Sequence, residues 1–130
     1  MKITASYEGL TRIENGDYVL ENDLIVDGNI EVELDDRFVV RGRLEATKSI
    51  IARCGIEAGD GIEAGCGIEA GWGIKAGDGI EAKTIDCKKR IFAGISLYKT
   101  LNDCIKTIKC QKLICGEIAY GDLIIESEDK

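Results

Sequence analysis

The sequence predicts an all-β protein, a single-stranded β-helix (solenoid) with roughly triangular coils whose handedness is left undetermined. The first observation is a six-residue period, plainest in GIEAGDGIEAGCGIEAGWGIKAGDGIEA at residues 55–82. The second is a chain of 130 residues with 16 glycines, no proline and 5% aromatic residues, which suits many tight corners around a small aliphatic core. A period of six does not match the 3.6 residues of an α-helical turn, and glycine disfavours a helix by roughly 1 kcal/mol per residue.

Each six-residue repeat, or hexad, combines a three-residue strand with a three-residue corner. In Ile-Glu-Ala the first and third side chains point inward and the Glu points outward, because side chains alternate across a strand. Gly59-Asp60-Gly61 is a typical corner, in which we expect glycine to provide positive φ angles. A three-residue strand cannot bury its apolar face alone, so successive coils must stack. We prefer three hexads per coil over two, because Ile and Ala from three sides fill a triangular core.

The chain divides into four segments. Residues 1–19 lack the period, contain an NGD turn, and are expected to cap the first coil and cover its open backbone edge. Residues 20–99 form the hexapeptide-repeat β-helix. Residues 100–125 begin with a break, TLNDC, and continue as coils with five-residue spacing. Residues 126–130 form a polar tail.

An apolar anchor marks the first strand position of each hexad. In the first phase the anchors are Leu20, Val26, Val32, Phe38, Leu44, Ile50, Ile56, Ile62, Ile68, Ile74 and Ile80. After Ala82 the phase slips by one residue, and the six-residue spacing continues at Ile85, Ile91 and Leu97. The spacing then shortens to five, at Ile108, Leu113, Ile118 and Leu123. A second small or apolar residue stands two positions after nearly every anchor, so the inner wall is continuous.

Two stretches outside the perfect repeats carry a family resemblance. LIVDGNIEVE at residues 24–33 and VVRGRLEATKSIIA at residues 39–52 resemble the coils of bactofilins, bacterial cytoskeletal scaffolds whose β-helices join end to end. The IEAG copies at residues 56–82 resemble a Gly-rich repeat of bacterial and phage proteins. The likeness covers about residues 20–99. It implies a β-helix and leaves the function open, because function belongs to sites rather than folds.

The hexads are also similar to the left-handed hexapeptide-repeat family, best known from acyltransferases. Those enzymes usually place a small residue two positions before the anchor, where this chain has Asp60, Trp72 and Asp78. They also rely on a histidine as general base, and this chain contains no histidine. Acyl transfer is therefore not expected.

The residue types argue against an enzyme, and we predict no catalytic residue and no cofactor. Without histidine, Ser–His and Cys–His pairs are impossible, and the glutamates occupy outward positions of the repeat. Six cysteines lack the C-x-x-C spacing typical of zinc sites, so no metal is expected. Cys87, Cys110 and Cys115 occupy the inner slot otherwise held by Ala and are predicted to pack in the core, whereas Cys54 and Cys66 lie at corners.

Charge and the N-terminus limit the partners and the compartment. The chain has 24 acidic and 17 basic residues, a net charge of −7, which argues against a nucleic-acid or anionic-membrane surface. The N-terminal MKITASYEGL has no apolar signal core, and no apolar run is long enough to span a membrane as a helix. We therefore expect a soluble, cytoplasmic protein with reduced thiols.

The outward side chains supply the candidate partner-binding residues. With three hexads per coil, Glu45, Glu63 and Glu81 stack on one face, and Asp60 and Asp78 stack at one corner. Trp72 replaces Asp or Cys at a corner and should be exposed next to Cys54 in the coil below. Exposed tryptophan is enriched at contact centres, although a Trp lying flat over glycine corners would be merely structural.

Two functional hypotheses follow. The first is a non-enzymatic acidic binding protein that engages a basic partner protein, for example a phage-type inhibitor of nucleic-acid-processing or defence machinery. The second is a bactofilin-like scaffold that self-associates into a homo-oligomer through its open ends. Against both stands the simpler interpretation that the charges only keep the protein soluble and protect the sheet edges.

Overall fold

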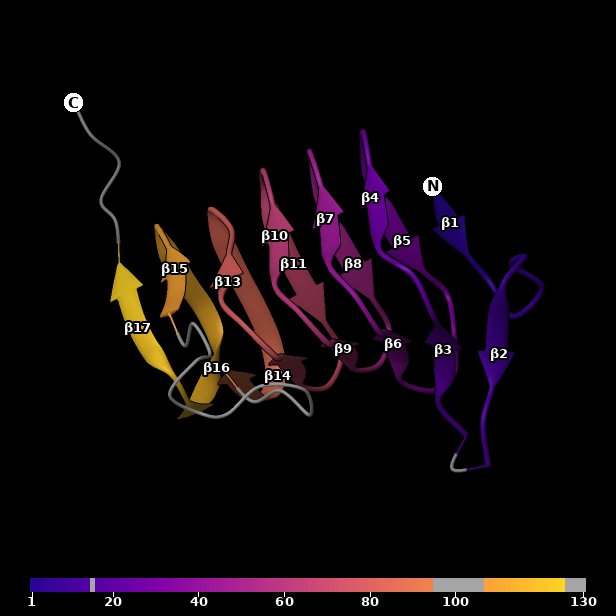
Figure 1. Ribbon diagram of the computed structural model, residues 1–130. Helices are drawn as coiled ribbons and strands as arrows, with labels where there is room; N and C mark the ends of the chain where they lie inside the picture. The colour runs from indigo at the N-terminus through magenta and orange to yellow at the C-terminus, as the bar shows by residue number, and fades with distance from the viewer. Residues whose placement is uncertain (15, 95–106, 126–130) are drawn as a thin grey trace.

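The computed structural model describes residues 1–14, 16–94 and 107–125, and over these residues the chain is an all-β solenoid of about five turns. The coils stack along one axis, with the N-terminus at one end and the last strand at the other (Figure 1). Neighbouring coils pair through parallel strands, apart from one antiparallel pair at the N-terminal end. The predicted fold class is confirmed.

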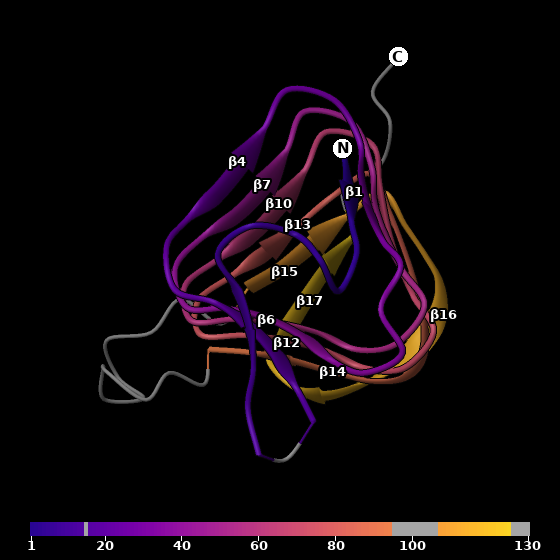
Figure 2. The same ribbon diagram turned by 90° about the vertical axis from the view of Figure 1, so that its right-hand side faces the viewer.

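The cross-section is triangular, so the solenoid has three faces (Figure 2). Face 1 contains β1 (Lys2–Ile3), β5 (Ile30–Val32), β8 (Ile50–Ala52), β11 (Gly67–Ala70) and the first part of β14 (Thr84–Ala93). Face 2 contains β3 (Tyr18–Leu20), β6 (Phe38–Val40), β9 (Ile56–Ala58), β12 (Ile74–Ala76) and the last part of β14. β16 (Lys112–Tyr120) pairs with β14 along both faces.

Face 3 is a separate six-stranded parallel sheet that consists of β4 (Leu24–Val26), β7 (Leu44–Ala46), β10 (Ile62–Ala64), β13 (Ile80–Glu81), β15 (Thr107–Cys110) and β17 (Asp122–Ile125). Seen from the N-terminal end, the chain ascends β4, descends beside β1 and returns along β6 while it recedes from the viewer (Figure 2). The solenoid is therefore right-handed. Its sense is opposite to that of the left-handed hexapeptide-repeat family.

The strand register confirms the coil of three hexads. Leu44, Ile62 and Ile80 stack on one another along face 3, and each lies three hexads after the one before. The predicted slip after Ala82 is also confirmed, because Ile85 stacks on Ile68 and Ile91 on Ile74. Leu97, the TLNDC break and the tail lie outside the described residues.

The predicted anchors Leu20, Val26 and Val32 are wrong by two positions. The residues that stack on Phe38, Leu44 and Ile50 are Tyr18, Leu24 and Ile30, so the first coil is longer than three hexads by two positions. The additional residues lie in the corner at 33–37, which is longer than the later corners. Leu34 is buried in this corner and extends the apolar alternation beyond the strand, which hides the insertion from a count of sixes.

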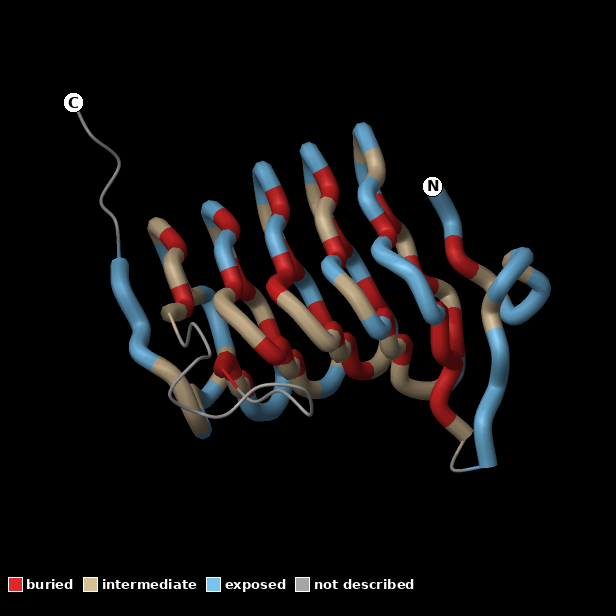
Figure 3. Tube along the Cα trace, viewed as in Figure 1, coloured by how far each residue is buried: buried red, intermediate tan, exposed pale blue. Residues whose placement is uncertain are grey.

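The core is a continuous column of aliphatic side chains with a column of small residues beside it. In the strands from β5 to β10 and in β12 the first and third residues are buried and the middle one faces outward (Figure 3). Cys87 and Cys110 replace alanine in the small column and are buried, as predicted. The chain needs few aromatic residues because these aliphatic and small side chains, stacked from coil to coil, fill the narrow interior.

The prediction that Cys115 packs in the core is wrong, because this residue is exposed. Leu113 stacks on Ile85 as the five-residue spacing predicted, but Cys115 pairs with Asp86, so Ile114 is an additional residue in β16. Such a β-bulge turns the following side chain to the opposite side of the sheet. Cys54 and Cys66 lie at corners, as expected, and Cys104 lies outside the described residues.

Among the described residues positive φ occurs at six glycines, which include Gly28 in the corner at 27–29. Gly59 and Gly61 do not have the predicted positive φ angles. Their corner needs glycine for space instead. A Cβ atom on Gly59 would lie under 3.0 Å from the carbonyl oxygen of Arg41 in the previous coil, which is closer than real Cβ atoms approach.

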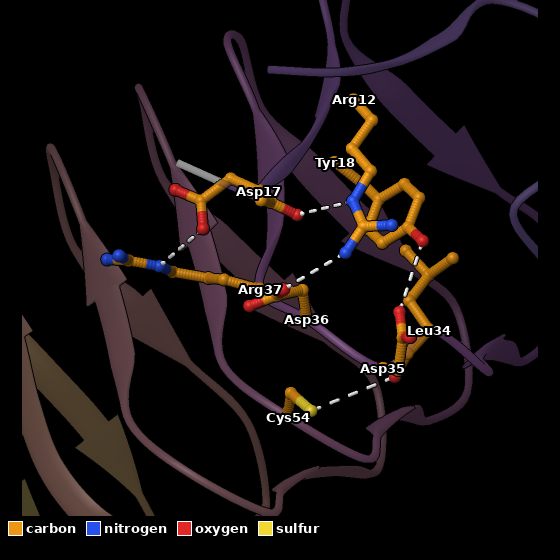
Figure 4. A network of polar contacts seen from close by, with 9 residues as sticks. Arg12, Asp17, Tyr18, Leu34, Asp35, Asp36, Arg37 and Cys54 are labelled. Carbon is orange, nitrogen blue, oxygen red and sulfur yellow. Dashed lines mark hydrogen bonds and ion pairs between the residues drawn. The ribbon is translucent and has the colours of Figure 1, made fainter. Parts of the chain in front are cut away.

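Residues at the N-terminus extend two of the three faces of the first coil. β1 pairs with β5 on face 1, and β2 (Leu10–Arg12) forms an antiparallel pair with β3 on face 2. The Arg12 guanidinium lies 4.9 Å from the centre of the Tyr18 ring, and the Tyr18 hydroxyl donates a hydrogen bond to Asp35 (Figure 4). Burial of the Tyr18 hydroxyl, followed by this hydrogen bond, raises its pKa above the ordinary value. The long corner at 33–37 thus anchors the hairpin.

Candidate functional site

The middle residues of β7, β10 and β13 place three carboxylates in one column on face 3. Glu63 pairs in register with Glu45 on one side and with Glu81 on the other, as the coil of three hexads predicted. Their neighbours along each strand are buried, so these side chains must point outward. Adjacent strands lie about 4.8 Å apart, and like charges at that spacing repel one another.

Arg43 offsets part of this repulsion. Its guanidinium forms an ion pair with Glu45 and a second one with Glu63, whose Oε1 lies 3.4 Å from Nη2. The hydrogen bond to Glu45 is the main reason that the pKa of Arg43 is raised. Within the described residues no ion pair joins Glu81, although Lys109 is its register neighbour on β15. Arg43 therefore offsets charge at Glu45 and Glu63, and Glu81 is the member of the column without an ion pair among the described residues.

Asp60 and Asp78 lie at the corner between faces 2 and 3, next to this column. The Asp78 amide donates to the Asp60 carbonyl oxygen at 3.4 Å, so the two residues stack in successive coils, as predicted. Between this corner and the column lies a groove of about 290 Å³, whose wall includes Glu63, Asp78 and Glu81. We call the surface formed by Glu45, Asp60, Glu63, Asp78 and Glu81 the acidic face.

Trp72 is exposed next to Cys54, as predicted, but it is not part of the acidic face. Trp72 lies between β11 and β12, at the corner that joins faces 1 and 2. This corner is opposite face 3 in the triangular section (Figure 2). The Trp72 amide donates to the carbonyl oxygen of Cys54 at 3.4 Å, and its own carbonyl accepts from Lys89 at 3.3 Å. The residue is 56% exposed.

The neighbours of Trp72 form a basic ridge that the sequence did not reveal. Gly71, which precedes Trp72, stacks on Arg53 in the coil below. The coil above carries Lys88, Lys89 and Arg90, all exposed. The sequence Lys88-Lys89-Arg90 indicated a basic corner. Because the phase slips after Ala82, the sequence did not show that this corner would stack on the corner of Trp72. We call Arg53, Trp72, Lys88, Lys89 and Arg90 the Trp72 ridge.

The ridge has few local counter-charges. Lys88 lies 3.6 Å from Asp86, and Arg90 lies 3.7 Å from Glu117, with both partners of the second pair largely exposed. Exposed pairs of this kind are worth about 0–1 kcal/mol and leave both charges available to a partner. Among the described residues no ion pair involves Arg53 or Lys89.

The thiols offer little chemistry in the part of the chain that the structure describes. Burial raises the pKa of Cys87 and Cys110, which disfavours the reactive thiolate. Over residues 1–14, 16–94 and 107–125, no three Cys, Asp or Glu side chains are grouped so as to hold a metal ion. In the same ranges no helix has the length and apolarity to cross a membrane.

These features define a right-handed β-solenoid with an acidic face and a separate basic, tryptophan-bearing ridge. No protein-family model, no curated protein and no solved structure matches the chain. The assignment as a β-solenoid therefore rests on the structure of this chain and not on similarity to a known protein. Membership in the bactofilins or in a Gly-rich repeat family stays a prediction.

Proposed function

We propose that this chain is a non-enzymatic binding protein whose acidic face docks a basic partner protein. The observation that carries this proposal is the column of Glu45, Glu63 and Glu81, held in register by the parallel sheet of face 3. Because the backbone pairing fixes the spacing of the three Glu Cα atoms, the strands need no rearrangement on binding, and the entropic cost of association is limited to ordering the side chains. A partner with regularly spaced Lys or Arg residues would complement them. An inhibitor of a nucleic-acid-processing or defence protein is one such role, because proteins of that kind carry basic grooves.

The test compares two variants of equal charge. Glu45, Glu63 and Glu81 are changed together to Gln, and in the control Glu8, Glu14 and Glu69 are changed to Gln. Both triples change the net charge from −7 to −4, and the control residues are exposed and lie outside the acidic face. Binding of a fluorescent decapeptide of alternating Lys and Arg is measured by anisotropy in 50 mM and 300 mM salt, with circular dichroism to confirm folding.

We expect the acidic-face variant to bind at least about tenfold more weakly and the control to change less than about twofold. Binding should weaken in 300 mM salt, since exposed charges are screened over about 8 Å at physiological ionic strength. An equal loss in both variants would show that net charge alone attracts the peptide and would reject the acidic face as a site.

A second candidate function, self-association through the solenoid ends, is favoured by the C-terminal coil. β17 is the last strand of face 3, and its Ile125 is 53% exposed. Ile114, in the last coil, is also 53% exposed. Unpaired parallel strands with apolar side chains are a template for further pairing.

This candidate predicts rods longer than one solenoid in negative-stain electron microscopy. Ile125→Lys should shorten them, because a buried charge would oppose pairing at the end. The matched control is Ile51→Lys, which changes an isoleucine that is 42% exposed in the middle of face 1. Single particles of the wild-type chain at all concentrations would argue against the scaffold.

A further inference from the structure

The Trp72 ridge has the structure of a contact surface. Gly71 and Gly73 flank Trp72, so the two residues next to it in the chain have no side chain that could cover the indole ring. The ring is 56% exposed, although covering a Trp buries about 150–250 Å² and makes this residue a frequent binding hot spot. Cationic residues lie in the coils on both sides of it. A surface of this composition fits a partner that is acidic and has a recess for one large ring.

The same molecule carries such a surface on its opposite side. The groove of about 290 Å³ at the acidic face is lined by three acidic residues, Glu63, Asp78 and Glu81, and by two basic residues, Arg43 and Lys109, with Gly61 and Gly79 at its wall. Successive coils of both surfaces have the same spacing, about 4.8 Å, because both follow the same parallel strands. The ridge carries its cations one coil below and one coil above Trp72. Carboxylates that lie two coils apart on the acidic face, such as Glu45 and Glu81, have the same separation and can therefore face these cations in another copy.

We propose that the Trp72 ridge of one molecule docks onto the acidic face of a second copy, with the indole ring in the groove beside Glu63 and Glu81. The proposal deepens the proposed function and rests on it, since it names a second copy as one basic partner of the acidic face. The two contacting surfaces are different, so the contact is heterologous. Such contacts extend into chains of molecules unless a rotation closes them into a ring.

A heterologous contact allows a complementation experiment. Trp72→Ala removes the ring but keeps the acidic face, whereas Glu63→Lys with Glu81→Lys reverses the acidic face but keeps the ridge. Each variant alone should be monomeric. A mixture should form a one-to-one dimer and nothing larger, because only one ridge and one acidic face remain intact. Mass is measured by light scattering after gel filtration, from about 10 to 500 µM protein in 50 mM salt, with reductant present because Cys66 is exposed.

The control reverses two exposed charges elsewhere, Glu8→Lys with Glu14→Lys, which gives the same net charge of −3. We expect it to associate like the wild-type chain, and we expect 500 mM salt to dissociate both. A monomeric wild-type chain at every concentration would overturn the proposal, as would a mixture that stays monomeric. Association that Ile125→Lys abolishes and Trp72→Ala leaves intact would assign the contact to the solenoid end instead.

The outcome is separable from that of the proposed function. Trp72→Ala retains the whole acidic face and should bind the Lys/Arg decapeptide as the wild-type chain does. If the ridge proposal fails, this peptide binding persists. If the acidic face is not a site, the matched Gln triples bind the peptide equally, whatever the oligomeric state.

Discussion

Gly71 illustrates how closely successive corners are stacked. A Cβ atom at this position would lie under 3.0 Å from the carbonyl oxygen of Arg53 in the previous coil. Gly59 and Gly65 occupy the equivalent places at the other two corners, and a Cβ atom on either would be equally crowded by the carbonyl oxygen below it. In these three corners the first glycine is therefore required by the contact between coils and not by its own φ angle. A glycine-rich repeat thus reports on the stacking of coils, which a single coil would not reveal.

Single polar contacts also help to hold neighbouring coils together at a buried thiol and at the stacked carboxylates. Cys87 donates from Sγ to the carbonyl oxygen of Trp72 at 2.9 Å, so a side chain that fills an alanine slot also satisfies a corner carbonyl. Arg43 holds two of the three stacked glutamates. The contacts Cys87–Trp72 and Arg43–Glu63 connect neighbouring coils, and the contact Arg43–Glu45 connects a strand with the corner before it.

At the scale of the strand, the register of the first coil can be tested with two isoleucines. Ile30 is fully buried in β5, and Ile25 is 63% exposed in β4. We expect Ile30→Ala to lower the free energy of unfolding by about 2–5 kcal/mol, because it leaves a cavity in the core. Ile25→Ala should change it by less than about 0.5 kcal/mol, as is usual for surface positions.

Urea denaturation followed by circular dichroism measures both variants. If both variants lowered the free energy of unfolding equally, the two-residue insertion at 33–37 would be contradicted. A strict six-residue period without that insertion places the anchors at Val26 and Val32 and not at Ile30. Ile62→Ala in β10 serves as a reference for a core position at which sequence and structure agree.

Most strands from Phe38 to Ala82 could be predicted from the sequence, because three-residue strands and three-residue corners alternate there without interruption. What could not be predicted are changes of corner length that keep the apolar alternation. Leu34 hid the long first corner, and Ile114 hid the bulge that exposes Cys115. The Glu column followed from the coil length alone. The Trp72 ridge did not, since it depends on how the coil after the slip stacks on the coil before it.

At the scale of the molecule, the two ends differ. β1 and the β2–β3 hairpin extend faces 1 and 2 at the N-terminal end, whereas β4 is the first strand of face 3. At the other end, β17 is the last strand and its four residues are exposed. Each coil contacts chiefly its two neighbours, so the stability of a coil depends on whether it is covered on both sides.

This asymmetry predicts a gradient of local stability along the solenoid. Amide hydrogen exchange should be slowest in β9 to β12, which are covered on both sides, and fastest in β16 and β17, because an end coil opens at a lower free energy than the whole molecule. Exchange is measured by mass spectrometry of overlapping peptides. Ile108→Ala, in the coil beneath β17, should accelerate exchange in β17 more than in β7, since the effect of a weakened interface falls with distance in a linear array. Equal protection from β4 to β17, or an equal effect of Ile108→Ala on both strands, would show instead that the solenoid opens only as one cooperative unit.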